Sequence, residues 1–343
     1  MSTLIDVAVL LVIITGIIIA CEAFTNSIEW LGKLLNLNEG AVGSVLAAVG
    51  TALPETIVPI IAITSAYMSG NPGGAAIGEG AIVGAPFMLS TLAMFITGAA
   101  IVIFVRQGRR GPEMPVDTVV LGRDLTTFLV VYALGILATF VPDWGLGGWL
   151  TVKHFIGFGL IGIYAWYVAR TLAEPGELGG DISPLYFARK HDEPPMWRVA
   201  LQILVALGAI IVGAHFFVER IEHLAELWHV PALVLSLLIT PVATELPEKL
   251  NSVLWVRVKK DTLALGNLTG AMVFQSCIPV AVGLWMTPWN LSKPSLLSAA
   301  IALASGAVLV LYMRRTGKLT PWILMVGGAF YLAFVIGLWW VKA

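Results

Sequence analysis

Two Leu-Pro-Glu tripeptides place acidic side chains in the middle of long apolar stretches. The first, Leu53-Pro54-Glu55, recurs 193 residues later as Leu246-Pro247-Glu248. A carboxylate at the centre of a membrane is costly unless something offsets its charge, and a bound cation is the simplest partner. The alternative is that both glutamates are protonated and hydrogen-bonded to neighbouring helices. Their recurrence as a related pair favours the cation.

The residues around each glutamate could supply further oxygen ligands. Thr51 and Glu55 are four residues apart, as are Thr244 and Glu248, so each pair shares one face of a helix. The proline before each glutamate removes a helical N–H donor, which frees carbonyl oxygens of the preceding turn. Calcium takes about six to eight oxygen ligands in flexible geometry. Soft metals prefer Cys and His, and neither residue lies next to these two glutamates. The pattern therefore predicts a site for a hard cation such as calcium.

A third carboxylate, Glu245, precedes Glu248 by three residues and so lies on nearly the same helix face. It could bind the cation, or it could titrate and carry a proton. The alternative is an ion pair with Lys249, four residues further on, without any contact to an ion, and the two roles can coexist. Gln275, a polar residue in a later apolar stretch, is one more candidate ligand.

Membrane-spanning helices must position these residues. The chain has 343 residues, of which 58% are hydrophobic and only 12% are charged. That charged fraction is about half of what a soluble domain carries, so too little polar surface is available to cover the protein in water. The formal net charge of -1 gives no reason to expect nucleic acid as a partner. Cys21 and Cys277 form no C-x-x-C pair and are predicted to be free thiols.

Apolar segments of about 20 residues predict an all-α membrane protein with ten transmembrane helices. The first segment is predicted to be a span and not a signal peptide, because no Lys or Arg precedes it and no convincing cleavage site follows it. The approximate bounds are 4–24, 40–66, 76–105, 121–142, 149–170, 197–218, 230–256, 262–286, 294–313 and 319–341. Most of the 20 Lys and Arg residues fall on one side of this layout, which is predicted to be cytoplasmic. Both termini would then face outward.

The two tripeptides also indicate an internal repeat. At the same offset, Ile28-Glu29 matches Ile221-Glu222. Five predicted spans separate the copies, and because five is odd, the second copy enters the membrane with the opposite orientation. We therefore expect two inverted five-helix repeats, residues 1–173 and 196–343, joined by a cytoplasmic linker over residues 174–195. Inverted repeats are typical of secondary transporters, whose site lies near the midplane between the repeats.

At these residues the chain resembles the sodium/calcium exchanger family of cation/calcium antiporters, in its prokaryotic form without a regulatory domain. Each repeat of that family carries a G-T-S-L-P-E or A-T-S-L-P-E motif, followed on the next helix by G-N-x-x-G-S-N. Here residues 50–55 read G-T-A-L-P-E and residues 243–248 read A-T-E-L-P-E. The second motif is present as G-N-L-T-G at residues 266–270 and is weaker at residues 80–86.

The resemblance implies exchange of calcium for sodium by alternating access. It makes Glu55 and Glu248 calcium ligands, while Thr51 and Thr244 supply carbonyl or hydroxyl oxygens. It implies a transporter and not an enzyme, without a cofactor, whose partners are membrane lipid and the transported cations. It also implies a multi-pass protein of a prokaryotic cell membrane, and it leaves the oligomeric state open.

The chain departs from the family pattern at several sodium ligands. The serine after each threonine is replaced by Ala52 and by Glu245, and the polar residue that closes each second motif falls at Leu89 and at Gln275. The alternative is therefore that the protein exchanges calcium, or another divalent cation, for protons. Glu245 would then be an added titratable site. The chain has no H-E-x-x-H motif that would favour an intramembrane enzyme. Matched broken helices in inverted halves favour a carrier over a passive channel.

Overall fold

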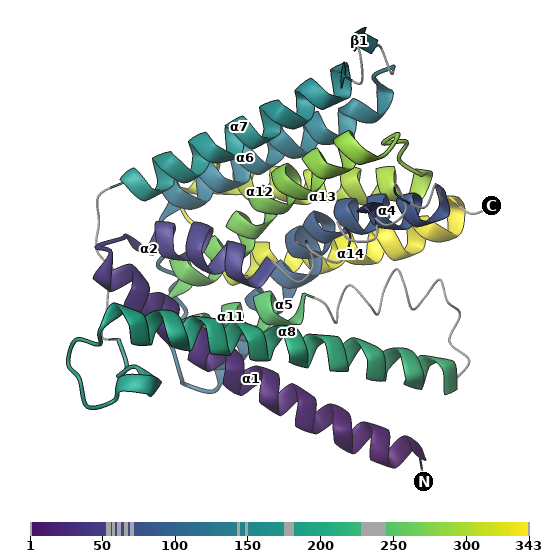
Figure 1. Ribbon diagram of the computed structural model, residues 1–343. Coiled ribbons are helices and arrows are strands. Elements are labelled where there is room, and N and C mark those ends of the chain that lie inside the picture. The colour runs from purple at the N-terminus through teal and green to yellow at the C-terminus, as the bar shows by residue number, and fades with distance from the viewer. Residues whose placement is uncertain are drawn as a thin grey trace.

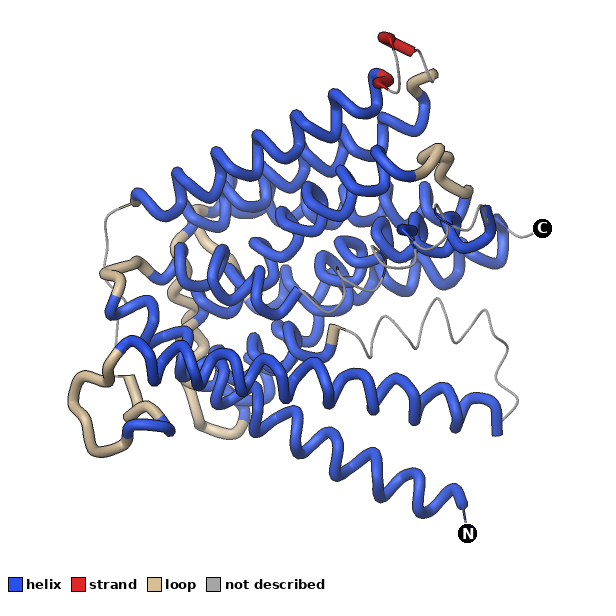
Figure 2. The backbone as a smooth tube through the Cα atoms, viewed as in Figure 1, coloured by secondary structure: helices blue, strands red, loops and turns tan. Residues whose placement is uncertain are grey.

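The structure is a computed structural model, and it describes residues 2–52, 56, 59, 63–64, 68, 72–142, 145–147, 150–174, 182–227 and 245–341. Almost all of the described chain is helical (Figures 1 and 2). The strands in these ranges form a short antiparallel hairpin, β1 (Gly145–Gly147) with β2 (Leu150–Thr151), and loops join the helices. Glu55 and Thr244 lie outside the described residues.

Eight helical stretches within the described ranges are long and apolar enough to cross a membrane. They are Ala8–Leu34, Gly78–Arg106, Thr118–Phe140, Val152–Ala173, Met196–Gly213, Asp261–Met286, Lys293–Thr316 and Pro321–Leu338. Each matches one predicted span. The other two predicted spans, 40–66 and 230–256, lie partly outside the described residues.

The helices are named as in Figure 1. They are α1 (Ser2–Leu34), α2 (Glu39–Ala41), α4 (Pro72–Met88), α5 (Met94–Arg106), α6 (Thr118–Leu137), α7 (Val152–Ala173), α8 (Met196–Leu227), α11 (Leu246–Arg257), α12 (Asp261–Met286), α13 (Lys293–Thr316) and α14 (Pro321–Val341). Short 3-10 helices are η3 (Ala138–Phe140) and η4 (Tyr186–Ala188). Two segments are π-helical, η1 (Val42–Ala47) and η2 (Leu89–Ala93).

Capping residues fix where several helices begin and end. Asp117 caps α6, because its side chain accepts hydrogen bonds from the backbone N–H groups of Val119 and Val120. Ser292 caps α13 in the same way. Gly317, with a φ of 67°, ends α13 in the left-handed conformation that glycine adopts without strain.

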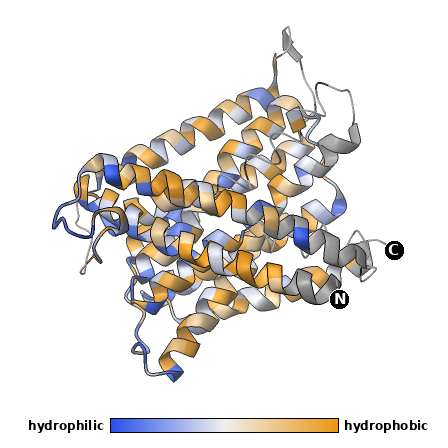
Figure 3. Cartoon of the chain, turned by 60° about the horizontal axis from the view of Figure 1, so that its bottom comes forward, coloured by the Kyte–Doolittle hydropathy of each residue, from blue (hydrophilic) through white to orange (hydrophobic). Residues whose placement is uncertain are grey.

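The helix α12 forms the centre of the molecule, and 83% of its spanning window is buried. It packs against α6, α7, α4, α11 and η1. The long helices α1 and α8 pack along each other at one side of this bundle (Figure 1). The beginning of α1 and the end of α14 lie at the same end of the molecule. Apolar residues cover the helices, while hydrophilic residues gather toward the opposite end (Figure 3).

The end of the predicted linker ties α1 to α8. Trp30 of α1 packs in a small apolar cluster with Leu185, Ala188 and Val199. The indole N–H of Trp30 also donates a hydrogen bond to the carbonyl of Ser183 at 3.0 Å. At their shared end, α1 and α8 are therefore joined through residues 182–203 as well as by direct packing.

Candidate functional site

Glu248 lies in the first turn of α11, directly after Pro247. Pro247 is so close to the start of the helix that its missing N–H costs no helical hydrogen bond. The exposed fraction of Glu248 is 0%. Within the described ranges, neither carboxylate oxygen has a hydrogen-bond partner. Buried polar groups are almost always paired, so two unpaired oxygens on one buried carboxylate indicate a partner outside the described part of the chain. This environment fits the predicted cation ligand.

Asn267 of α12 connects Glu248 with Thr51. The Thr51 hydroxyl, fully buried, donates to Asn267 Oδ1 at 3.2 Å and is also within reach of the carbonyl of Ala47. Asn267 Nδ2 donates to the backbone carbonyl of Glu248 at 3.4 Å. The structure therefore brings two predicted site residues, one before and one after the predicted linker, to the same asparagine.

Glycines allow this close approach. A Cβ added at Gly270 would overlap the backbone carbonyl of Ser44, and one at Gly43 would lie 2.9 Å from the carbonyl of Leu263. Gly266, one turn before Gly270, likewise faces Ser44. Small residues spaced by four let two membrane helices pack backbone to backbone. In the G-N-L-T-G motif, the glycines bring α12 against η1, and Asn267 between them reaches Thr51.

Glu245 forms the ion pair that its spacing to Lys249 predicts. Lys249 Nζ lies 2.9 Å from Glu245 Oε2, and both side chains are almost completely buried. Pairing offsets part of the cost of removing each charge from water. The structure thus bears out the pairing, which does not exclude the predicted contact with a cation. That contact remains a prediction.

Gln275 is buried in α12, with an exposed fraction of 1%. In the described part of the chain, its amide oxygen and nitrogen have no partner, and the same holds for both amide atoms of Asn251 and the hydroxyl of Ser276. Asn251 lies one turn after Glu248 on α11, a spacing that could have identified it from the sequence. Sequence reasoning named Gln275 but missed Asn251 and Ser276.

Among the described residues, no three His, Cys, Asp or Glu side chains are grouped so that they could hold a metal ion. The predicted site needs only one carboxylate from each half plus neutral oxygens. Of the six predicted ligands, the structure places Thr51, Glu245, Glu248 and Gln275 in the buried interior. Glu55 and Thr244 lie outside the described ranges.

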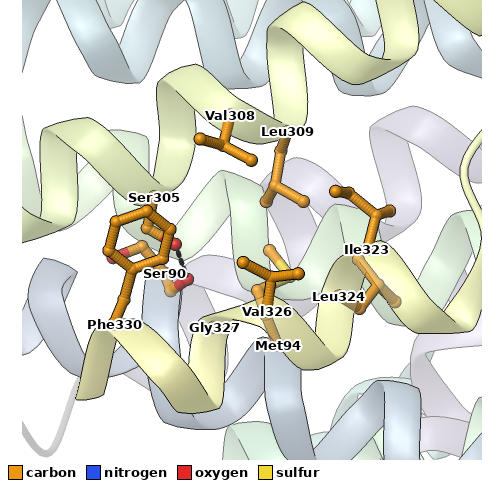
Figure 4. A pocket seen from close by; sticks show the side chains of 10 residues that line it. All are labelled: Ser90, Met94, Ser305, Val308, Leu309, Ile323, Leu324, Val326, Gly327 and Phe330. Carbon is orange, nitrogen blue, oxygen red and sulfur yellow. Dashed lines mark hydrogen bonds between the residues drawn. The ribbon is translucent and has the colours of Figure 1, made fainter. Parts of the chain in front are cut away.

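A crevice between η2, α13 and α14 contains none of the predicted ligands (Figure 4). Its lining is apolar except for Ser90 and Ser305, and the Ser305 hydroxyl donates to the carbonyl of Ser90 at 2.7 Å. The crevice is too narrow to hold a water molecule. It is a packing gap and not an ion site.

Comparisons with known proteins show which proteins this chain is similar to. The chain matches Sodium/calcium exchanger MaX1 of Methanosarcina acetivorans at 26% identity over 40% of each chain. It matches Putative antiporter CaxA of Alkalimonas amylolytica at 22% identity over 92% of each chain. The structure of the sodium-calcium exchanger NCX_Mj soaked with 10 mM Na+ and 10 mM Sr2+ has the same fold, with a TM-score of 0.73 at 18% identity, over 97% of this chain and 98% of that one.

The sequence profile of one protein family covers nearly the whole chain. It is described as Sodium/calcium exchanger protein, and it matches residues 5–173 and residues 198–340. A match of this extent includes both Leu-Pro-Glu motifs. The chain belongs to the sodium/calcium exchanger family of membrane transporters.

Proposed function

We propose that this protein exchanges calcium for sodium across the membrane by alternating access. Glu248 from one half and Glu55 from the other bind calcium, and Thr51, Thr244 and Gln275 add oxygen ligands. The observation that carries the proposal is the fully buried Glu248 carboxylate, which lacks a partner in the described part of the chain. A divalent cation would compensate the charge of two carboxylates at once.

The proposed architecture is two inverted five-helix repeats with ten spans, residues 1–173 and 196–343, and both termini outside. Eight apolar helices account for eight of these spans. The two stretches that match the family profile, 5–173 and 198–340, have nearly the same bounds as the two proposed halves. The excess of Lys and Arg at one face supports a cytoplasmic linker over residues 174–195.

Alternating access requires a unit that moves relative to the site. We propose that α1 and α8 slide together against the remaining bundle, which carries Glu248 and Thr51. These two helices pack along each other and are also joined by residues 182–203. An empty site would leave carboxylates unpaired in a closed, low-dielectric interior, so only the loaded site should permit the movement.

Exchange of a divalent cation for protons is the second candidate. The serines that would bind sodium in the family pattern are replaced here by Ala52 and Glu245. Glu245 is 1% exposed and lies one turn before Glu248. A buried carboxylate beside another one could take up a proton in one state and release it in the other. The burial of Glu245 beside a second buried carboxylate, Glu248, is the specific feature that favours this candidate.

The test is radioactive calcium uptake into proteoliposomes under an imposed sodium gradient or an imposed pH gradient. We expect sodium-driven uptake, and uptake driven only by the pH gradient would select the second candidate. Glu248→Gln should abolish uptake in either case, while the protein still purifies as a folded species. Glu193→Gln, which changes an exposed linker glutamate, is the matched control and should transport normally. Normal uptake by Glu248→Gln would refute the assignment of the site.

A further inference from the structure

Asp124 is a fully buried carboxylate that the proposed exchange does not use. It lies in the second turn of α6, and its exposed fraction is 0%. Ser44 and Thr269 donate hydrogen bonds to its Oδ2 at 2.5 and 2.9 Å, and Tyr167 donates to its Oδ1 at 2.9 Å. The Arg123 guanidinium lies 3.3 Å from the same Oδ1. Since the protein satisfies both oxygens, this carboxylate needs no ion.

The two donors to Oδ2 come from the helices that meet at the candidate site. Ser44 is part of the π-helix η1, and Thr269 is part of α12. Their backbones are in contact at this level, because a Cβ at Gly270 would overlap the Ser44 carbonyl. One carboxylate oxygen therefore joins η1 and α12 where they approach most closely. The donors to Oδ1 come from α6 and α7 on the outer side of α12 (Figure 1).

The same two helices carry Thr51 and Asn267. Thr51 follows Ser44 by about two turns in the helical segment Glu39–Ala52, and Asn267 precedes Thr269 by two residues in α12. Thr51 Oγ1 and Asn267 Oδ1 are 3.2 Å apart. A shift of η1 along α12 by a fraction of a turn would separate them. A π-helix is a rare conformation with an extra residue in its turn, so η1 needs tertiary contacts to hold its register.

We propose that Asp124 is a positioning residue for the cation site. Through Ser44 and Thr269, it fixes the register of η1 against α12, and it thereby holds Thr51 and Asn267 in the geometry that receives the transported cation. This inference rests on the function proposed above. It assigns no ion contact to Asp124 itself.

Calcium uptake by purified, monodisperse protein in proteoliposomes tests the role. Asp124→Asn keeps the size of the side chain but replaces one acceptor oxygen with a donor. Buried hydroxyls that donate to the carboxylate then lose their acceptor. We expect the KM for calcium to rise about tenfold, with a smaller change in the maximal rate per folded transporter. Ser44→Ala and Thr269→Val should each raise the KM, and each should add little on top of Asp124→Asn. Thr171→Val removes a buried hydroxyl that donates to the Tyr167 carbonyl one turn earlier in α7, and it should keep the wild-type KM.

An unchanged KM in folded Asp124→Asn would overturn the proposal, as would full additivity with Ser44→Ala or an equal rise in Thr171→Val.

A second measurement does not depend on transport. Cysteines replacing Thr51 and Asn267, in a background with Cys21→Ala and Cys277→Ala, should form a disulfide several-fold more slowly when Asp124→Asn is added. If the wild type imports no calcium, the proposed function fails, and the cross-linking rates still decide the role of Asp124. Equal cross-linking rates with and without Asp124→Asn would refute the positioning role of Asp124.

Discussion

At the residue scale, the buried Glu245–Lys249 pair makes a prediction about stability. Lys249→Met leaves the Glu245 charge buried without its partner, which should cost about 3 kcal/mol. The double substitution Glu245→Gln with Lys249→Met removes both charges and should be less destabilised than Lys249→Met alone. Thermal unfolding in detergent, without added divalent cation, measures the difference. A double variant that is less stable than either single variant would show that the two side chains do not act as a pair.

How far the sequence predicts the site depends on where each partner lies in the chain. Glu245 and Lys249 are on one helix, so their spacing predicts the contact. The burial of Glu248 follows from its place inside an apolar stretch. Asp124 gives no such signal, because a lone aspartate beside Arg123 at the start of a predicted span has the pattern of an interfacial pair. Its main partners, Ser44 and Thr269, come from distant parts of the chain, and only the tertiary structure brings them together.

At the element scale, the glycines of α12 should be intolerant of any side chain. Gly270→Ala places a Cβ on the Ser44 backbone, so α12 and η1 must move apart. We expect a destabilisation of about 2 kcal/mol and a marked loss of calcium uptake per folded transporter. Gly162→Ala is the control, because a Cβ at that position of α7 would meet no other described atom within 4 Å beyond its own helix backbone. If Gly270→Ala unfolds and transports like Gly162→Ala, the close packing is not required.

Sequence-based bounds agree best where a helix ends together with its apolar stretch. The predicted span 262–286 matches α12 (Asp261–Met286), and 294–313 matches most of α13. The prediction 4–24 is too short for α1, which runs to Leu34. Its polar last turns continue as a helix because Trp30 packs on the linker and Glu29 binds other helices. The π-helices could not be predicted, because they lie in segments of small and apolar residues, where an inserted residue shifts no clear polar face.

At the scale of the whole molecule, α1 contacts two kinds of neighbour. It packs along α8 for much of its length, and a Cβ added at Gly213 of α8 would touch the side chain of Ile17. Its other contact is with the main bundle, where the Trp255 indole N–H donates to Glu29 Oε1 at 2.8 Å. Lys260 also lies 2.5 Å from Glu29 Oε2. If α1 and α8 slide as one unit, only the contacts of the second kind must break in each cycle.

Cross-linking distinguishes these contacts. In a background with Cys21→Ala and Cys277→Ala, a disulfide between Ile17→Cys and Gly213→Cys joins α1 to α8 and should leave calcium uptake nearly unchanged. A short bifunctional thiol reagent that joins Glu29→Cys to Lys260→Cys ties α1 to the turn before α12 and should block uptake. The two single-cysteine variants treated with the same reagent are the controls. Uptake that stops on linking α1 to α8, or that continues with α1 tied to the bundle, would mean that a different part of the molecule moves.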